Sequence, residues 1–544
     1  MQVDTHNKEF QDALNLIQYT RQSVFLTGKA GTGKSTFLKY VCEVTKKKHI
    51  VLAPTGIAAI NAGGSTLHSF FKLPFYPLLP DDPKFSLKDG KLHSFLRYTS
   101  AHRKLIKEVE LVIIDEISMV RADIIDFIDK ILRVYSQNMR EPFGGKQILL
   151  VGDIFQLEPV IKNDEREIIN RFYPTPYFFS ARVFQEMELV SIELTKVYRQ
   201  SDKIFVNVLD HIRTNTAGAA DLQLLNTRYG SQIEESEADM YITLATRRDT
   251  VDSINEKKLA ELPGESITFE GVIEGDFPES SLPTSQELVL KPGAQIIFIK
   301  NDFDRRWVNG TIGVIAGIDE EEETIYVITD DGKECDVKRD SWRNIRYRYN
   351  EKTKEIEEEV LGSFTQYPIR LAWAITVHKS QGLTFSRVVI DFTGGVFAGG
   401  QAYVALSRCT SLDGIQLKKP INRADIFVRP EIVNFAGRFN NRQAIDKALK
   451  QAQADVQYAA AARAFNKGDM EECLEQFFRA IHSRYDIEKP VPRRLIRRKL
   501  GIINTLKEQN KKLKEQMREQ QERLRQYAHE YLLMGNECIT QAHD

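Results

Sequence analysis

Residues 28–35 of this chain read GKAGTGKS and match the spacing G-x-x-x-x-G-K-[ST] in full. Glycines in this pattern let the backbone wrap around phosphate groups, which the loop N–H groups and the N-terminus of the following helix attract. Lys34 is placed to reach the β- and γ-phosphates of a nucleoside triphosphate, and Ser35 is placed to ligate Mg²⁺. The spacing therefore predicts that the chain binds ATP together with Mg²⁺.

An acidic pair, Asp115 and Glu116, follows the apolar run 111–114. At the end of a buried strand the first carboxylate can bind the metal ion, and the second can orient the water that attacks the γ-phosphate. Two carboxylates that only begin a turn are the alternative. The next apolar run ends in residues 152–157, which brings Gln156 to the same expected sheet edge. There it is either a γ-phosphate sensor or part of a plain loop.

The elements that must position these groups alternate along the chain. Short runs rich in β-branched residues are separated by helix-length segments, and they lie at 24–26, 50–52, 111–114 and 148–151. This alternation predicts a parallel sheet with helices on both faces.

Breaks in the pattern indicate how the chain is divided. Residues 73–100 are rich in Pro and Asp and have little periodicity, which predicts a small insertion. A second α/β region is expected from residue 191, with a small β-domain inserted at 313–366. We therefore expect an α/β fold with a first lobe at 1–190, a second lobe at 191–447 and a helical tail at 448–544.

Composition excludes several classes of protein. The 544 residues are 42% hydrophobic and 28% charged, and no apolar run approaches the ~18 residues that a membrane span needs. The five cysteines form no C-x-x-C pair, so neither a zinc site nor a disulfide framework is expected. A polar N-terminus gives no targeting signal, and we expect a cytoplasmic protein. With a formal net charge of −1, binding to nucleic acid would need a local positive groove.

An ordered series of motifs resembles the PIF-one and RecD-like branch of the superfamily-one helicases (superfamily 1B), which are 5′-to-3′ translocases. The resemblance covers about residues 10–410. The series is GKAGTGKS at 28–35, APTGIAA at 53–59, DEISM at 115–119, GDIFQLEPV at 152–160, VYRQ at 197–200, VHKSQG at 377–382 and YVALSR at 403–408. It implies two RecA-like P-loop lobes with small inserted subdomains, one of them a small SH3-like β-domain, and a motor that works as a monomer.

The resemblance also implies roles in the nucleotide site. Arg199 and Arg408 would be arginine fingers from the second lobe, although a surface or capping role is the alternative for each. The implied catalytic residues are Lys34, Glu116, Gln156, Arg199 and Arg408, with Ser35 and Asp115 as Mg²⁺ ligands. The implied ATP-binding residues are Gln11, Gly28, Ala30, Gly31, Thr32, Gly33, Lys34, Ser35, Thr36 and Gly382.

A track for single-stranded DNA is implied as well, since small polar groups hold phosphates and aromatic rings stack on bases. Its implied residues are Thr55, Gly56, His68, Phe70, Thr376, His378, Ser380 and Gln381. Of the adjacent Phe70 and Phe71, at most one is expected to face a base, and His68 is either a phosphate contact or a structural histidine. In the insertion, Phe75, Tyr76 and Phe85 either separate strands or form the small core of the insertion.

The resemblance implies an ATP-dependent helicase that moves 5′ to 3′ on single-stranded DNA and unwinds duplex junctions in replication, repair or telomere and G-quadruplex maintenance. One rival is a P-loop ATPase that translocates on or remodels DNA without separating its strands. Another is an adaptor whose ATPase is a switch and whose turnover does not respond to DNA.

The tail lies outside the resemblance. Residues 458–481 resemble one tetratricopeptide helix pair, and the basic cluster 493–499 either contacts phosphate or forms a solvated helix face. A heptad spacing follows, which predicts a coiled-coil seam against another helix of this chain or of a partner, with the same chain favoured. The seam consists of Ile503, Leu506, Asn510, Leu513, Met517, Gln520, Leu524, Tyr527, Tyr531 and Met534.

Overall fold

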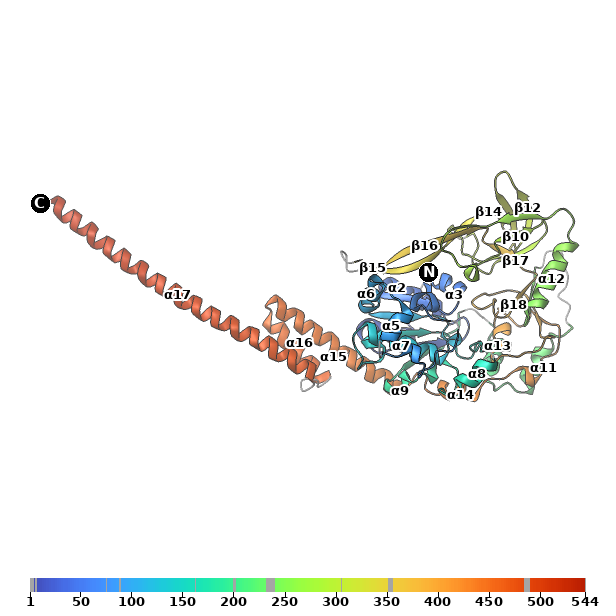
Figure 1. The fold of residues 1–544 in the computed structure, drawn as a ribbon, viewed down its shortest axis with the longest axis horizontal. Helices are drawn as coiled ribbons and strands as arrows, with labels where there is room; N and C mark the ends of the chain where they lie inside the picture. The colour runs from blue at the N-terminus through green and yellow to red at the C-terminus, as the bar shows by residue number, and fades with distance from the viewer. Residues whose placement is uncertain are drawn as a thin grey trace. The chain divides into compact units, whose positions relative to one another are not determined.

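A computed structural model describes residues 4, 7–74, 76–87, 90–161, 163–198, 202–230, 240–304, 306–350, 356–483 and 490–543. The chain forms two compact units, Met1–Leu449 and Lys450–Asp544, which are drawn in Figure 1. Among the described residues, every helix is too short or too polar to span a membrane.

The first lobe is built on a six-stranded parallel sheet with the order β3-β2-β4-β5-β1-β6. Alternate residues of its strands face two cores, so that Phe25 packs into one and Val24 and Leu26 into the other. The strands are β1 (Val24–Gly28), β2 (His49–Ala53), β3 (Ser65–Thr66), β4 (Leu111–Ile114), β5 (Gln147–Val151) and β6 (Val190–Leu194). The expected parallel sheet is confirmed.

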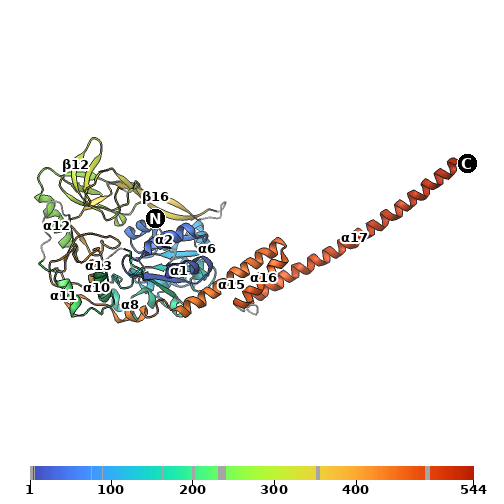
Figure 2. The ribbon, with the colours of Figure 1, turned by 180° about the vertical axis from the view of Figure 1, so that it is seen from behind.

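Helices cover both faces of this sheet. Helix α1 lies over the face that is turned to the viewer in Figure 2, where Phe10 and Ala13 join the core of Val24. The helices of the lobe are α1 (Lys8–Tyr19), α2 (Lys34–Val44), α3 (Gly56–Ala62), α4 (Leu67–Phe71), α5 (Lys91–Leu96), α6 (Ser100–Glu108), α7 (Ala122–Tyr135), α8 (Asn163–Ile169) and α9 (Val183–Glu186).

The boundary between the lobes differs from the expected one at residue 191. Strand β6 pairs in parallel with β1 along its whole length, from Val190 opposite Val24 to Leu194 opposite Gly28. It therefore completes the first sheet. The chain also returns to this lobe later, because Ile432 of α14 (Pro430–Ala436) is buried in its core and the Phe435 ring stacks on Phe179 at 4.4 Å.

The second lobe contains a four-stranded parallel sheet with the order β18-β7-β19-β20. Its strands are β7 (Ile242–Ala245), β18 (Ala374–Thr376), β19 (Val388–Asp391) and β20 (Ile415–Leu417). Its helices are α10 (Lys203–Arg213), α11 (Ala219–Asn226), α12 (Arg248–Glu261) and α13 (Gln401–Leu406). The sheet brings segments far apart in the sequence into contact, so that motifs near residues 380 and 408 share one lobe.

The inserted β-region is larger than the expected range 313–366, since its strands run from residue 267 to residue 371. A five-stranded antiparallel sheet contains β11 (Gln295–Phe298), β12 (Ile312–Asp319), β13 (Thr324–Thr329), β14 (Glu334–Val337) and β17 (Ile369–Leu371). Strands β9 (Val272–Gly275), β15 (Asp340–Tyr349) and β16 (Ile356–Gln366) form a second sheet, and β8 (Ile267–Glu270) pairs with β10 (Glu287–Leu290). The strands outside the expected range have only four residues (β8, β9, β10 and β11) or three (β17), which is too short for a clear period of two.

The insertion at 73–100 is packed rather than extended. Phe85 is fully buried and its ring lies 4.6 Å from that of Phe127 on α7. This places Phe85 in the core, whereas Tyr76 is 39% exposed. Phe75 lies outside the described residues.

The tail unit consists of the end of α15 (Arg442–Lys467), α16 (Met470–Ser483) and α17 (Pro490–His543). The expected helix pair is present, with Gly468 at φ 84° between α15 and α16 and the rings of Tyr458 and Phe477 5.9 Å apart. Helix α15 begins before residue 448, so the expected boundary falls inside a helix.

Helix α17 contacts this pair near its start. Lys499 of the basic cluster donates a hydrogen bond from Nζ to Asn466 Oδ1 at 2.8 Å and lies over the Phe465 ring. Farther along, the seam side chains are exposed, with Leu513 at 57% and Leu524 at 66%. The favoured packing of the seam against the helix pair of the same chain is therefore wrong for the described residues, because α15 and α16 are too short to reach along α17.

Candidate active site and adjoining cleft

The loop between β1 and α2 has the shape that the glycine spacing predicts. Gly31 and Gly33 have φ values of 80° and 89°, in the left-handed region that favours glycine. A side chain at Gly28 would lie 2.7 Å from the Leu194 carbonyl oxygen, so the loop can pass β6 only as glycine. Lys34 donates hydrogen bonds from Nζ to the carbonyl oxygens of Gly28 and Lys29, at 2.6 and 3.0 Å. The lysine ammonium is thus held against the loop.

The two carboxylates after β4 lie on the same edge of the sheet. The Glu116 N–H donates to Asp115 Oδ1 at 2.9 Å, and Glu116 has a φ of 49°. Burial raises the pKa of both carboxyl groups, and that of Glu116 reaches about 7 because Asp115 adds to the effect. Lys34 and Arg408 act in the opposite direction on the pKa of Glu116, which places both cations close to it.

One cleft joins the nucleotide loop to the expected DNA track. Ser35, Asp115 and Glu116 line it on the side of the first lobe, and residues 378–379 and 381–383 line it on the side of the second. Gln381 donates from Nε2 to Gln156 Oε1 across the lobes at 3.4 Å. The expected metal ligands, the expected water-orienting carboxylate and three expected DNA contacts, Thr55, His378 and Gln381, thus share a single space.

Ser35 and Asp115 fit Mg²⁺ as it binds in ATPases. The described residues contain no group of three or more His, Cys, Asp or Glu side chains that could hold a metal ion without help. Mg²⁺ commonly takes one or two protein oxygens and completes its shell with substrate phosphates and water. A single carboxylate and a hydroxyl beside a phosphate loop match this preference.

Arg408 extends from the end of α13 into the interior and is 1% exposed. Its Nε donates to the Val404 carbonyl oxygen at 2.9 Å, and Nη1 donates to the Leu383 carbonyl oxygen at 3.2 Å. These bonds hold the guanidinium near Glu116, whose pKa it lowers. The guanidinium is therefore not on the surface, and its bond to the Val404 carbonyl oxygen at the end of α13 is of the kind that the capping alternative expects. Arg199 lies outside the described residues.

The second lobe also touches the phosphate loop through residues that sequence reasoning left unassigned. The Ala30 N–H donates to the Tyr403 hydroxyl at 3.0 Å, and Lys29 forms an ion pair with Asp210 at 2.8 Å. Tyr403 stands within the motif YVALSR, which was the available signal. No sequence signal pointed to Asp210, because the position of a single carboxylate on a helix does not predict which residue it contacts in the folded chain.

A buried ion pair fixes the loop that carries Gln156. Arg213 of α10 is 3% exposed and donates to the fully buried Asp153 at 3.1 Å, while its Nη1 pairs with Glu193 at 2.8 Å. Although burial lowers the pKa of Arg213, the Asp153 and Glu193 carboxylates raise it above its ordinary value. Arg213 of the second lobe therefore holds the loop between Asp153 and Gln156 in place, and two carboxylates balance its charge.

Two of the expected DNA contacts lie at the N-terminus of α3. Thr55 caps the helix, because its Oγ1 accepts a hydrogen bond from the Ala58 N–H at 3.2 Å, and it lines the cleft. Gly56 packs against the β-region, where a side chain would lie 2.7 Å from Ser281 Oγ. The glycine is thus required by the approach of two domains.

The segment after β18 divides into accessible and buried groups. His378 is half-buried and stacks on the Phe397 ring at 6.4 Å, and burial lowers its pKa. Thr376 Oγ1 accepts from the Lys379 N–H at 3.2 Å. Ser380 is fully buried and its hydroxyl donates to the Val377 carbonyl oxygen, so its expected role as a DNA contact is wrong for this conformation.

The aromatic part of the expected track is also buried. Phe70 is 4% exposed and packs edge-on against Phe71 and beside the His102 ring, so the expected stacking of a base on Phe70 is wrong for this conformation. His68 is half-buried, and its pKa is lowered by burial and by Arg121. Gln11 is exposed on α1.

Comparisons with known proteins agree with this geometry. A family model described as PIF1-like helicase matches residues 4–219. The ATP-dependent DNA helicase Pif1 of Campylobacter jejuni is 34% identical over 412 residues, which are 73% of this chain and 88% of that protein. A crystal structure of Bacteroides sp Pif1 in complex with ADP-AlF4 has a TM-score of 0.73 and 42% identity, and the match covers 80% of this chain and 97% of that one. Bacteroides Pif1 bound to single-stranded DNA has a TM-score of 0.58 and 41% identity, with coverage of 81% and 98%.

Proposed function

Since this chain belongs to the PIF1-like helicase family, we propose that it is an ATP-dependent DNA helicase that moves 5′ to 3′ along single-stranded DNA. The cleft that carries Glu116 and Gln381 together is the main support for this proposal. A hydrolysis site and a DNA contact that share one space can change together, because closing the lobes on one ligand repositions the groups that meet the other.

Each group of the nucleotide site has a chemical task in this proposal. The N–H groups of residues 28–33 and the Lys34 ammonium hold the β- and γ-phosphates, and Glu116 orients the attacking water. Arg408 stabilises the charge that develops on the γ-phosphoryl group, from the opposite lobe. Mg²⁺, which Ser35 and Asp115 would hold, neutralises charge shared by the β- and γ-phosphates when it is bound.

The interlobe contacts support a cycle in which nucleotide closes the cleft. Tyr403 holds the Ala30 N–H, and Gln381 holds Gln156, so both lobes contact the groups that meet the γ-phosphate. Closure around ATP followed by release after hydrolysis would shift the second lobe along the strand. Thr55 on one lobe and His378 on the other are the groups we assign to the DNA backbone.

DNA is the proposed polymer because Bacteroides Pif1 has been crystallised bound to single-stranded DNA, and a structure of two Pif1 helicases concerns unwinding at forked double-stranded DNA. A translocase that never separates strands is the second candidate. It is favoured by the packing of Phe85, which removes one expected strand-separating ring from the surface.

Unwinding of matched duplexes with either a 5′ or a 3′ single-stranded tail tests the proposal. The purified chain with ATP and Mg²⁺ should separate the 5′-tailed duplex and leave the 3′-tailed one intact. Opening of only the 3′-tailed duplex would contradict the polarity. ATP hydrolysis that DNA stimulates, with neither duplex opened, would establish the translocase.

A further inference from the structure

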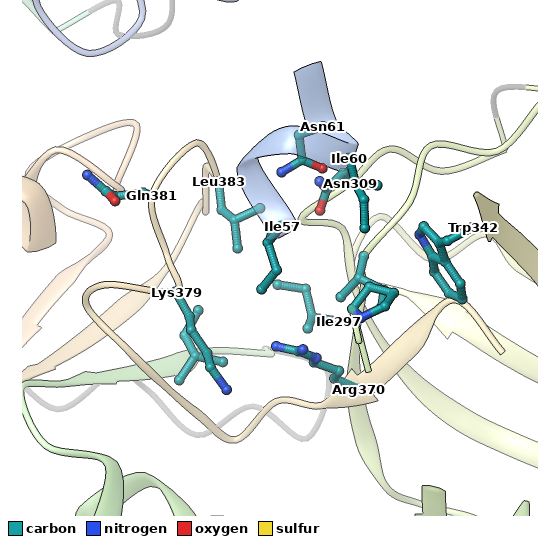
Figure 3. A pocket seen from close by; sticks show the side chains of 13 residues that line it. Ile57, Ile60, Asn61, Ile297, Asn309, Trp342, Arg370, Lys379, Gln381 and Leu383 are labelled. Atoms are coloured by element: carbon teal, nitrogen blue, oxygen red, sulfur yellow. The ribbon is translucent and has the colours of Figure 1, made fainter. Parts of the chain in front are cut away.

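A second pocket lies between α3, the inserted β-region and the segment after β18 (Figure 3). Ile57 and Ile60 of α3 form one wall, and Ile297 of β11 lies opposite them. Gln381 lines both this pocket and the cleft of the nucleotide site. The pocket therefore adjoins the cleft in which we propose that the DNA strand binds.

Arg370 enters the pocket because of the alternation of its strand. Its neighbour Ile369 is fully buried in the core of the β-region, so Arg370 points to the other face of β17, opposite Ile297. Figure 3 shows its guanidinium directed into the pocket on the side of Lys379. The two cations come from segments on either side of β18 and share one small space.

No described residue compensates the Arg370 charge. Among the described residues none accepts a hydrogen bond from its guanidinium, and the thirteen residues that line the pocket include no Asp or Glu. Burial alone lowers the pKa of Arg370 to about 10, and burial together with Arg370 and Arg248 lowers the pKa of Lys379. Asp252, the one carboxylate that acts on Lys379, is 3.3 Å from Arg248 and paired with it.

Arg213 is the internal comparison for this site. Arg213 is buried and meets two carboxylates, whereas Arg370 is half-buried and meets no carboxylate among the described residues. Removing a charge from water without a partner costs free energy that folding does not return. A guanidinium that has no carboxylate partner and lies beside a second cation in a pocket is suited to bind an anionic group of a ligand.

We propose that Arg370, with Lys379 beside it, binds a backbone phosphate of the DNA strand. A guanidinium matches two phosphate oxygens with its planar fork, and an ammonium supplies a compact second charge. The isoleucine walls suit the apolar edge of a sugar or base, and the amides of Asn61 and Asn309 supply polar contacts at the rim. This inference rests on the proposed function, and it identifies the pocket through which the DNA strand would pass.

The salt dependence of DNA binding tests the site directly. For single strands, the slope of log K against log salt concentration changes by about 0.7 for each phosphate contact. Binding of a fluorescein-labelled oligodeoxythymidine, followed by anisotropy across a salt series, should give Arg370→Gln a slope shallower by about 0.7. Its affinity at low salt should fall by about tenfold or more. Arg370→Lys should keep the slope of the unchanged protein.

A matched control lies on α12. Lys257 is 77% exposed in its side chain and does not line the pocket, so Lys257→Gln should give the slope of the unchanged protein. A slope for Arg370→Gln equal to that of the unchanged protein would overturn the phosphate site while leaving the helicase proposal standing. Failure of the unchanged protein to bind the oligonucleotide would instead overturn the proposed function.

Thermal unfolding separates a binding role from a packing role. Because the Arg370 charge has no partner among the described residues, Arg370→Gln should keep or raise the unfolding midpoint without DNA. The oligonucleotide should then raise the midpoint less than it does for the unchanged protein. A midpoint that falls without DNA, and that Arg370→Lys restores, would assign Arg370 to packing and overturn the proposal.

Discussion

The two units of the molecule differ in how far their important side chains are buried and partnered. In Met1–Leu449 the site groups are held by buried partners, as Arg408 is held by carbonyl oxygens and Arg213 by two carboxylates. In the tail, α17 presents Leu513, Met517 and Leu524 to solvent at 57%, 60% and 66% exposure. The described site groups of the first unit thus find their partners within one chain, whereas the heptad side chains described in the second unit remain exposed.

This difference in burial indicates which function each unit can perform without a partner. Catalysis needs preorganised groups in a dry site, and the described part of the first unit supplies them without help. A long helix with an exposed apolar seam gains stability only when a second helix covers that seam. We therefore expect the chemistry to be independent of the tail and the tail to serve association.

The largest effect is expected at the phosphate loop. Lys34→Ala removes the ammonium that meets the β- and γ-phosphates, and Glu116→Gln removes the carboxylate that orients water, so either change should abolish ATP turnover. Phosphate release measured in the presence of single-stranded DNA checks this. Lys46→Ala, an exposed lysine outside the cleft, is the control and should keep turnover. Turnover in both site variants would contradict the assigned nucleotide site.

The next effect concerns Arg408. An arginine finger contributes roughly 10³ to 10⁵ in rate, and it acts mainly on charge that develops in the transition state. Arg408→Ala should therefore lose hydrolysis by at least that lower factor while it still binds a fluorescent ATP analogue. A fall of less than about tenfold would show that Arg408 is structural.

The ion pair between the lobes should affect stability rather than chemistry. Arg213→Met leaves the buried Asp153 and the half-buried Glu193 without a counter-charge, and breaking a buried pair costs about 3–5 kcal/mol. The thermal midpoint should fall clearly. Adding Asp153→Asn to Arg213→Met should recover part of the loss, since fewer charges are then left alone. No recovery would mean that packing against Phe155, rather than charge, explains the effect.

The smallest effect on the motor is expected from the tail. Leu513→Asp combined with Leu524→Asp places charges in the seam, which should abolish association of α17 with a second helix. Sedimentation of the full chain at increasing concentration measures whether that helix belongs to a second copy. A sedimentation coefficient that rises with concentration in the unchanged protein and not in the variant is the expected result. A concentration-independent monomer in both would assign the seam to a different protein.

The position of the phosphate loop after a strand, and of the acidic pair at a strand end, could be read from the sequence because both depend on local geometry. The loop at 28–35 and the pair Asp115 and Glu116 follow strands whose apolar runs are visible without any knowledge of the fold. The order of these two motifs along the chain, and the strands that they follow, can therefore be read from residue spacing alone.

Features that depend on distant partners were not predicted. Strand β6 belongs to the first sheet only because it pairs with β1, with Val190 opposite Val24, which lies 166 residues earlier in the chain. Ser380 and Phe70 have the right chemistry for DNA but are buried by neighbours that no spacing reveals. Arg213 and Arg370 look alike in sequence and differ only in what folding places beside them.

The most direct test of the account is the ATPase rate with and without single-stranded DNA, measured for the unchanged chain and for Leu513→Asp with Leu524→Asp. The account predicts strong stimulation by DNA in both, to the same extent, because the motifs that hydrolyse ATP lie in Met1–Leu449. Loss of stimulation in the tail variant while its first unit still unfolds at the same temperature would contradict the separation of motor and tail. Absence of stimulation in the unchanged chain would contradict the coupling of the nucleotide site to DNA.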